Sequence, residues 1–393
     1  MKLASRMGHL GTESAFAVLA QAQALEAAGR AVVHLEIGEP DFPTPPHIVE
    51  AAADALRAGH THYVPAPGIP ELRESVSAFL ERTGRLRADP GRVVITPGAK
   101  PIMFYAILAL CEEGDEVLCP DPSFPMYASI TAFAGAVPVA IPLREGGGFR
   151  LDPEELERLV TPRTRLVILN SPHNPCGSAM TREDCEAVAE IAMRHDLTVL
   201  SDEVYWAIRY DAGRASVLDV DGMAERTILL DGWSKTFAMT GWRLGFGVLP
   251  PALVEPVTRL VINSVSCTSA ANQMAGKAAL DGPWEPVETM VAEFARRREV
   301  IVEGLNRIPG ITCAVPEGAF YVFPNVRELG LPSAQLQERL LSEAGVACLA
   351  GTAFGAWGEG HLRLSYANSI DNIRRALDAI GSFAAAQGAV APA

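Results

Sequence analysis

The feature that most constrains the fold of this chain is a regular alternation of short apolar segments with longer amphipathic ones. The short segments are typical of buried strands, and the longer ones, such as residues 182–195, have helical periodicity. Strands interleaved with helices predict an α/β fold with a mainly parallel seven-stranded sheet that helices cover on both faces. The predicted strands are residues 93–96, 116–119, 137–141, 166–169, 198–200, 227–230 and 244–248.

The two ends of the chain are organised differently. They predict helices over residues 14–29, 286–307, 333–344 and 371–382, and strands within residues 319–323 and 361–365. We therefore expect a large domain formed by residues 46–280 and a smaller α+β domain formed by residues 1–45 and 281–393. The end rich in Ala and Gly, residues 384–393, is expected to lack regular structure.

The composition excludes several kinds of partner. A net charge of −14 does not suit nucleic acid or an anionic membrane. The three arginines at 296–298 have acidic neighbours, so we interpret them as a solvated helix face. No apolar run approaches a membrane span, and residues 1–11 lack the apolar core of a secretory signal. Seven scattered cysteines without C-x-x-C spacing argue against disulfides and zinc and favour the cytoplasm.

Polar residues follow the ends of several predicted strands. Asn174, Asp202 and Lys235 follow the strands at 166–169, 198–200 and 227–230, and a Gly-containing turn at 97–100 follows the first strand. The carboxyl ends of parallel strands meet at one edge of a sheet. The sequence therefore predicts a ligand site at this edge.

Lys235 is the candidate nucleophile of this site. It lies in a predicted loop between apolar residues such as Trp233 and Phe237, and desolvation lowers the pKa of a lysine and makes it reactive toward carbonyls. A lysine Schiff base is the covalent chemistry of pyridoxal phosphate (PLP), which needs a carboxylate at its pyridine nitrogen, a position that Asp202 suits. Tyr205 is close enough in sequence to reach the phenolic oxygen of PLP. The simpler alternatives are a surface lysine, a helix N-cap for Asp202 and core packing for Tyr205.

A phosphate group also needs donors. The turn at 97–100 opens a predicted helix, whose first backbone N–H groups suit an anion, and Gly98 permits close approach of the backbone. Arg243 adds a bidentate cation. An ordinary strand-to-helix loop is the alternative for this turn.

Several motifs together resemble those of the class I and II aminotransferases of fold type I, the aspartate aminotransferase superfamily. The segment SKTFAMTGWRLG at 234–245 is similar to the cofactor-lysine signature S-K-x-x-x-x-x-G-x-R-x-G. The other matching segments are EIGEPDF at 36–42, YVPAPGIPELR at 63–73, SPHNPCG at 171–177, DEVY at 202–205 and RLSYA at 363–367. The resemblance therefore extends over nearly the whole chain.

The resemblance implies roles for the residues around the ring of PLP. Lys235 would carry PLP as a Schiff base and later move a proton at the substrate Cα. Asp202 would pair with the ring nitrogen, and Tyr205 and Asn174 would bind the phenolic oxygen. Phe124 would lie against the face of the ring.

The resemblance also implies the other contacts of cofactor and substrate. The backbone at Ala99 and Lys100 would bind the phosphate together with Arg243. Tyr63 would reach the phosphate of a neighbouring subunit, which implies a homodimer. The guanidinium of Arg363, helped by the backbone at Gly38, would bind the α-carboxylate of the substrate.

The implied reaction is a ping-pong transfer of an amino group between an L-amino acid and a 2-oxo acid. In some relatives a lysine at the position of Lys100 helps to bind a second carboxylate of the substrate. Residues 15–17 are Ala, Phe and Ala and lack the hydroxyl groups of such relatives, so an apolar or aromatic substrate side chain is an equal expectation.

The chain departs from the family pattern at three positions. His173 and Cys176 replace the commoner Asn and Thr of the turn, where we expect them to shape the backbone and Cys176 to be a packing thiol. Gly232 replaces a serine that binds phosphate in many relatives, so this contact is expected to be missing.

Three other activities were compared with amino transfer. A PLP-dependent lyase or synthase on the same scaffold stays open, because one fold supports many reactions. A PLP-sensing regulator would carry a basic DNA-binding extension, for which the chain has no room before residue 36. A dinucleotide-binding dehydrogenase needs G-x-G-x-x-G after a strand, and the glycines at 146–148 do not form that motif.

Overall fold

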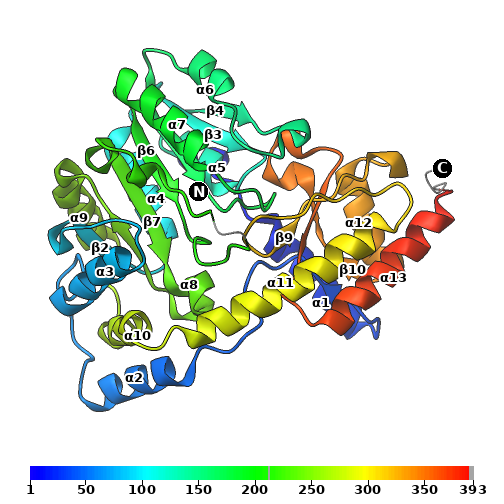
Figure 1. The fold of residues 1–393 in the computed structure, drawn as a ribbon, viewed down its shortest axis with the longest axis horizontal. Helices are drawn as coiled ribbons and strands as arrows, with labels where there is room; N and C mark the ends of the chain where they lie inside the picture. Colours follow the sequence, from blue (N-terminus) through cyan, green and yellow to red (C-terminus); the bar gives the residue numbers. More distant parts are fainter. Residues whose placement is uncertain (211–212, 389–393) are drawn as a thin grey trace.

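The central feature of the fold is a seven-stranded sheet with the order β2-β8-β7-β6-β5-β3-β4 (Figure 1). The computed structural model describes residues 1–210 and 213–388. All neighbouring strands are parallel except β8, which is antiparallel to β2 and β7. The strands are β2 (Val93–Thr96), β3 (Glu116–Asp121), β4 (Val137–Pro142), β5 (Thr164–Asn170), β6 (Thr198–Asp202), β7 (Thr227–Gly232) and β8 (Gly245–Val248). The predicted fold class and all seven predicted strands are thereby confirmed.

Helices cover both faces of this sheet because the central strands are apolar on both sides. In β5, Leu166 and Ile168 belong to the core beneath α4, α5 and α9, whereas Val167 and Leu169 belong to the core beneath α6 and α7. A third core lies between the sheet and α2, α3 and α10. The helices are α2 (Pro46–Arg57), α3 (Pro70–Arg82), α4 (Lys100–Leu110), α5 (Met126–Phe133), α6 (Pro153–Leu159), α7 (Arg182–Arg194), α9 (Pro251–Val265) and α10 (Ala270–Asp281).

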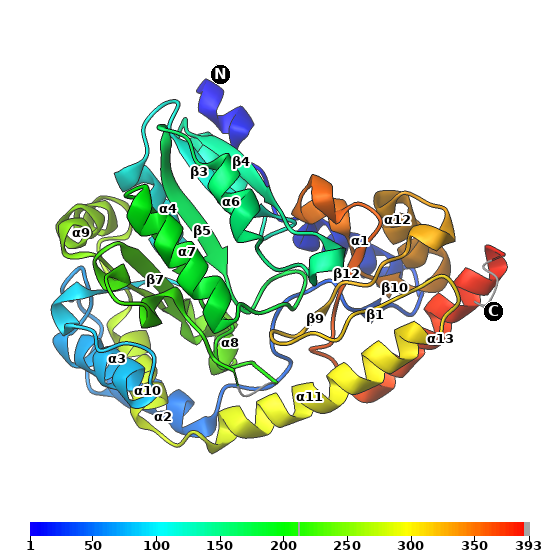
Figure 2. The same cartoon turned by 45° about the horizontal axis from the view of Figure 1, so that its top comes forward.

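The remaining elements form a second group beside the large sheet (Figure 2). They surround a parallel pair, β1 with β10, and an antiparallel sheet with the order β11-β12-β9. Both chain ends contribute elements to this group, and the division into domains at residues 45 and 280 stays a prediction. The elements are α1 (Ser14–Ala27), β1 (Val33–His34), α11 (Glu285–Asn306), β9 (Tyr321–Val322), α12 (Ser333–Ala344), β10 (Val346–Ala347), β11 (Leu349–Ala350), β12 (Leu362–Ser365) and α13 (Ile370–Ala386).

The structure corrects two details of the second group. Helix α13 continues to Ala386, so the expectation of an irregular end is wrong for residues 384–386, and residues 389–393 lie outside the described part. Arg297 is only 6% exposed, so a solvated helix face is the wrong interpretation for it. Its guanidinium donates to Asp41 at 2.6 Å and to Glu293 at 3.1 Å and so joins α11 to the chain before α2.

The sequence argued against a membrane span, a metal site and disulfides, and the structure can be compared with these expectations over residues 1–210 and 213–388. No helix there is long and apolar enough to cross a membrane, and no group of three or more potential ligands is arranged for a metal ion. All seven cysteines are free thiols.

Candidate active site

Three neighbouring strands deliver the candidate residues to one edge of the large sheet. Asp202 ends β6, Asn174 follows β5, and Lys235 lies on the one-turn helix α8 (Trp233–Thr236) that follows β7. The loop predicted around Lys235 is therefore wrong in detail, since a helical turn follows the strand directly. The register pairs Asn170 with Asp202 across β5 and β6, so these segments end side by side.

The amine of Lys235 is half-buried within this site. Its Nζ donates to the carbonyl oxygen of Gly38 at 2.5 Å, which connects the end of β7 with the segment after β1. Burial lowers the pKa of Lys235 to about 8, against the opposing negative charge of Glu39. A substantial fraction of the amine is therefore uncharged near neutral pH and available as a nucleophile or base. A solvent-exposed lysine is the wrong interpretation.

The carboxylate of Asp202 faces the same interior. Its Oδ2 accepts a hydrogen bond from the Tyr127 hydroxyl at 2.6 Å, and its Oδ1 accepts one from the backbone N–H of Val204 at 3.3 Å. Burial raises the pKa of Asp202 to about 6. Residues 203–210 form turns instead of a helix, so a helix N-cap is the wrong explanation for Asp202.

Two further candidates, Arg363 and Asn174, contact each other. The Nη1 of Arg363 donates to Oδ1 of Asn174 at 3.4 Å, and Nη2 donates to the carbonyl oxygen of Glu36. Its Nε is buried without a hydrogen-bond partner. Burial lowers the pKa of Arg363, and rings of Tyr321 and Phe354 lie 4.6 and 5.0 Å from its Cζ. A buried cation with an unused donor fits an anionic ligand.

Tyr205 has a different neighbour from the expected one. Its hydroxyl lies 2.7 Å from the hydroxyl of Tyr321, and its pKa is raised by burial and by that neighbour. The ring centroid of Tyr205 lies 6.0 Å from Nζ of Lys235. Tyr205 is therefore buried within the site, and its hydroxyl shares a hydrogen bond with a residue that the sequence did not single out.

The turn before α4 and the segment before β8 are in close contact. Gly98 has a φ of +90°, and a Cβ at this position would overlap Nη2 of Arg243. A Cβ at Gly245 would overlap the backbone nitrogen of Ala99. The guanidinium of Arg243 therefore lies over the first backbone groups of α4, where a helix favours an anion.

The remaining candidates lie on the side of the site formed by the start of α1. Nζ of Lys100 forms an ion pair with Oε1 of Glu13 and lies 5.3 Å from the ring centroid of Phe124. The phenol of Tyr63, by contrast, faces solvent in this structure, since 87% of the residue is exposed.

The three departures from the family motifs have packing explanations. A Cβ at Gly232 would lie 3.0 Å from Cα of Gly245 and from the carbonyl oxygen of Leu244, so a serine would require the strands to shift. His173 is buried, and burial lowers its pKa to about 3 and keeps the ring neutral. Burial raises the pKa of the Cys176 thiol, which does not suit a nucleophile.

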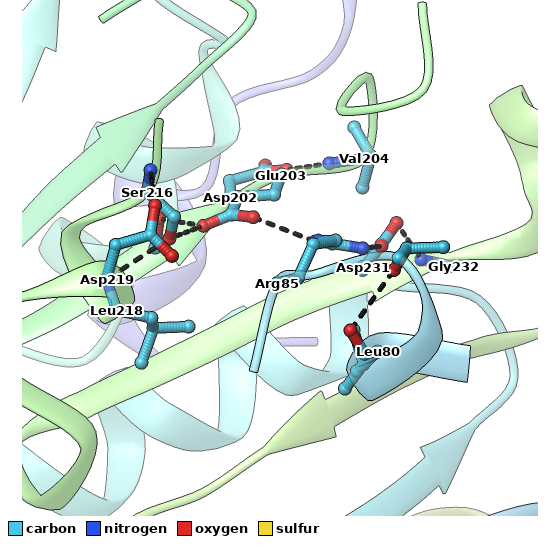
Figure 3. Close-up of polar contacts among 12 residues, drawn as sticks. Leu80, Arg85, Asp202, Glu203, Val204, Ser216, Leu218, Asp219, Asp231 and Gly232 are labelled. Atoms are coloured by element: carbon cyan, nitrogen blue, oxygen red, sulfur yellow. Dashed lines mark hydrogen bonds and ion pairs between the residues drawn. The ribbon is translucent and has the colours of Figure 1, made fainter. Parts of the chain in front are cut away.

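A cluster of buried charges lies at the ends of β6 and β7, next to Asp202 in the chain (Figure 3). We define this charge cluster as Arg85, Glu203 and Asp231. Arg85 donates to Asp231 at 2.6 Å and to Glu203 at 2.8 Å. Glu203 directly follows Asp202, and Asp231 lies four positions before Lys235. One guanidinium thus connects the ends of β6 and β7, from which the two central residues of the site extend.

Comparison with known proteins agrees with this architecture. The family model "Aminotransferase class I and II" matches residues 30–380. An aspartate aminotransferase of Pyrococcus abyssi is 43% identical over 88% of this chain and 90% of its own length. An aromatic-amino-acid aminotransferase of Thermococcus litoralis is 42% identical, again over 88% of this chain and 90% of its own. The solved aspartate aminotransferase of Rhizobium meliloti superposes with a TM-score of 0.94 at 36% identity, covering 98% and 99% of the two chains.

The fold and the family match define an enzyme that transfers amino groups. The chain belongs to the class I and II aminotransferases.

The residues present fit the cofactor that this family implies. Lys235 supplies an amine of lowered pKa, and Asp202 supplies a buried carboxylate for a protonated ring nitrogen. The Gly98 turn with Arg243 supplies an anion cradle, because only a residue without Cβ leaves room for the guanidinium. PLP carries these three complementary groups, an aldehyde, a pyridine nitrogen and a phosphate.

Sequence reasoning missed three residues of the site. Tyr127 bonds to Asp202, Tyr321 bonds to Tyr205, and Glu13 pairs with Lys100. The tyrosines occur in apolar segments, where a phenol is as typical of core packing as of a site. Glu13 is far from Lys100 in sequence, and no local pattern connects them.

Proposed function

We propose that this chain is a PLP-dependent aminotransferase that moves an amino group between an L-amino acid and a 2-oxo acid by ping-pong chemistry. The observation that carries the proposal is the arrangement of Lys235. Its amine is half-buried and has a lowered pKa, and the carboxylate of Asp202 and the guanidinium of Arg363 belong to the same site. These groups correspond to covalent attachment of a carbonyl, stabilisation of a ring cation and binding of an α-carboxylate.

When bound, PLP supplies an electron sink for the charge that develops at the substrate Cα. Lys235 would hold the cofactor until a substrate amine displaces it, and its Nζ would then take up the Cα proton and return it. A pKa of about 8 suits both directions of that transfer near neutral pH. Asp202 would hold the proton on the ring nitrogen, and the Tyr127 hydroxyl would orient its carboxylate.

The roles of the other residues follow from their positions. Arg363 would bind the α-carboxylate, with Asn174 and the backbone at Gly38 nearby. Arg243 and the backbone at Ala99 and Lys100 would bind phosphate. Phe124, Asn174 and Tyr205 would contact the ring or its oxygen. These assignments rest on the motif resemblance together with the placements described above.

We also propose a homodimer in the cytoplasm. A large exposed phenol at Tyr63 suits a contact with a neighbouring subunit, in which it would reach the partner's phosphate site. Seven free cysteines suit a reducing compartment. Sedimentation equilibrium of the holoenzyme tests the dimer, and a monomer at micromolar concentration would contradict it.

A single-turnover experiment distinguishes amino transfer from the lyase chemistry that the scaffold also supports. Holoenzyme is mixed with an amino donor and no acceptor. Amino transfer releases one equivalent of 2-oxo acid per subunit and retains the amino group on the enzyme. Continuous release of ammonia would contradict the proposal. The relatives are named as aminotransferases, which favours transfer and gives no support to the lyase.

The first prediction concerns the charge of Asp202. Asp202→Asn is expected to retain covalently bound cofactor but to lose about 10²–10³-fold in kcat, because a preorganised charge that stabilises the transition state contributes on that order. Tyr127→Phe, which removes one hydrogen bond and keeps the carboxylate, is the matched control and should lose much less. Steady-state kinetics of both variants provide the measurement, and equal kcat values in Asp202→Asn and wild type would contradict the role.

A second prediction concerns Arg363. Arg363→Ala is expected to lower kcat/KM for α-amino acids by about 10²–10³-fold, because one partner of a buried charge pair contributes about 2–5 kcal/mol. Arg363→Lys should recover only part of the loss, since an ammonium lacks the planar fork. Primary amines without a carboxylate should be affected little. An equal loss for those amines would show that the substitution damages the site in general.

A further inference from the structure

Glu13 makes an unexpected contact at the start of α1. It is the residue that precedes the helix, and its carboxylate makes no capping hydrogen bond to the backbone of α1. The carboxylate instead pairs with Nζ of Lys100 at the start of α4. Its side chain is 21% exposed, whereas that of Lys100 is 47% exposed, so the carboxylate is the more enclosed member of the pair.

One contact of Lys100 and the electrostatic influence of Glu13 place this pair on the substrate side of the site. Nζ of Lys100 lies 5.3 Å from the ring centroid of Phe124, the aromatic expected against the cofactor ring. Burial is the largest influence on the pKa of Lys235 and of Arg363. Among the smaller, electrostatic influences, the negative charge of Glu13 raises both pKa values. The substrate Cα is expected at Lys235 and its α-carboxylate at Arg363. A charge that acts on both residues is therefore close to the space in which the substrate side chain extends.

We propose that Glu13 is a specificity-determining residue that holds the ammonium group of Lys100 and thereby disfavours substrates with a second carboxylate. The inference rests on the proposed amino transfer and adds a substrate class to it, namely amino acids with uncharged side chains, including aromatic ones. An amino acid such as aspartate must displace Glu13 from Lys100 and is then repelled by the displaced carboxylate. An uncharged side chain leaves the pair intact.

The test is a double-mutant cycle on the holoenzyme. The ratio of kcat/KM for L-aspartate to kcat/KM for L-phenylalanine is measured in the wild type, Glu13→Gln, Lys100→Gln and the double variant. Glu13→Gln is expected to raise this ratio about tenfold, since one hydrogen bond to a charged group has that magnitude. In the Lys100→Gln background the same change should have little effect, because the ammonium that Glu13 occupies is then absent.

A binding measurement provides a second readout that does not depend on turnover. Calorimetric titration with maleate, a dicarboxylate without an amino group, should show about tenfold tighter binding in Glu13→Gln than in the wild type. Glu26→Gln is the matched control, because Glu26 lies in the last turn of the same helix and pairs with His34. It should change neither the ratio nor maleate binding.

The outcomes separate this inference from the proposed function. A ratio that is unchanged or lower in Glu13→Gln, or that rises equally when Lys100 is replaced, would overturn the role of Glu13 while amino transfer stands. If neither donor gives up its amino group to an acceptor, the proposed function itself fails. In that case tighter maleate binding in Glu13→Gln would still support the inference that Glu13 keeps Lys100 from binding a carboxylate. Unchanged maleate binding would overturn that inference.

Discussion

Lys235→Ala is expected to lose covalent attachment of PLP and to lose turnover by a factor on the order of 10⁵–10⁶, the cost of removing a residue that acts as both nucleophile and base. The expectation follows from the half-buried amine of Lys235, which combines a pKa of about 8 with a position close enough to Asp202 and Arg363 for their charges to interact. Reduction of the holoenzyme with borohydride and peptide mapping should place the cofactor on Lys235 in the wild type. The variant should lack both the adduct and the visible absorbance.

The modified lysine can be identified with few competing candidates, because the chain contains only four lysines, at positions 2, 100, 235 and 277. Lys277→Ala is the matched control, since Lys277 is on α10 and pairs with Asp281 at 2.6 Å at the surface. It should retain cofactor and activity. A reducible adduct that persists in Lys235→Ala would identify a different lysine and would overturn the central assignment.

The second large effect is expected on stability. Arg85→Met should lower the free energy of unfolding by about 3–5 kcal/mol, because removal of one partner leaves uncompensated charges in the interior. Arg85 occupies its position for a local reason. Helix α3 ends in a left-handed glycine, Gly84, and the N–H of Arg85 bonds to the carbonyl oxygen of Leu80 at 2.9 Å, which directs Arg85 back toward the sheet. There it meets Glu203 and Asp231 (Figure 3).

The loss should depend on pH in a defined direction. Burial raises the pKa of Asp231 to about 7, and the charge and hydrogen bonds of Arg85 oppose that rise. Without Arg85 the pKa rises further, so the native state binds more protons than the unfolded state over a wider range, and stability falls as pH rises. Arg85→Met should therefore be less destabilised at pH 5.5 than at pH 8. Urea unfolding at both values measures the difference.

Two further variants separate charge from packing. Arg57→Met removes one member of an exposed ion pair with Asp54 and should leave the unfolding midpoint nearly unchanged. The triple variant Arg85→Met/Glu203→Gln/Asp231→Asn removes all three charges and should recover much of the stability lost in Arg85→Met. If the triple variant is as unstable as the single one, lost packing against Trp206, whose ring lies 4.4 Å from Cζ of Arg85, is the cause.

The large sheet could be predicted from sequence because its strands carry their own signal. Residues 166–169 form a continuous apolar run, and such runs are typical of strands buried on both faces. The direction of β8 has no comparable signal. It is antiparallel because the short connection through α8 returns the chain directly beside β7, whereas a parallel neighbour would need a crossover.

The candidate site was predictable to the extent that its residues directly follow strands. Asp202 ends β6 and Lys235 lies in the helical turn that follows β7, so the order of the strands brings them together. Tyr127 is on α5 and Glu13 directly precedes α1, and their contacts with Asp202 and Lys100 depend on how those helices pack. Patterns of neighbouring residues in the sequence do not predict how these helices pack.

The pairing of β1 with β10 has a consequence for biosynthesis. Val33 aligns with Val346, so a strand that leaves the ribosome early has its partner near the opposite end of the chain. The apolar residues around β1, such as Leu35, then stay exposed until translation is nearly complete. The strands of the large sheet come from residues 93–248 and can pair earlier. We therefore expect the nascent chain to form its large sheet first and to depend on chaperones to protect the segment around β1 until β10 has been synthesised.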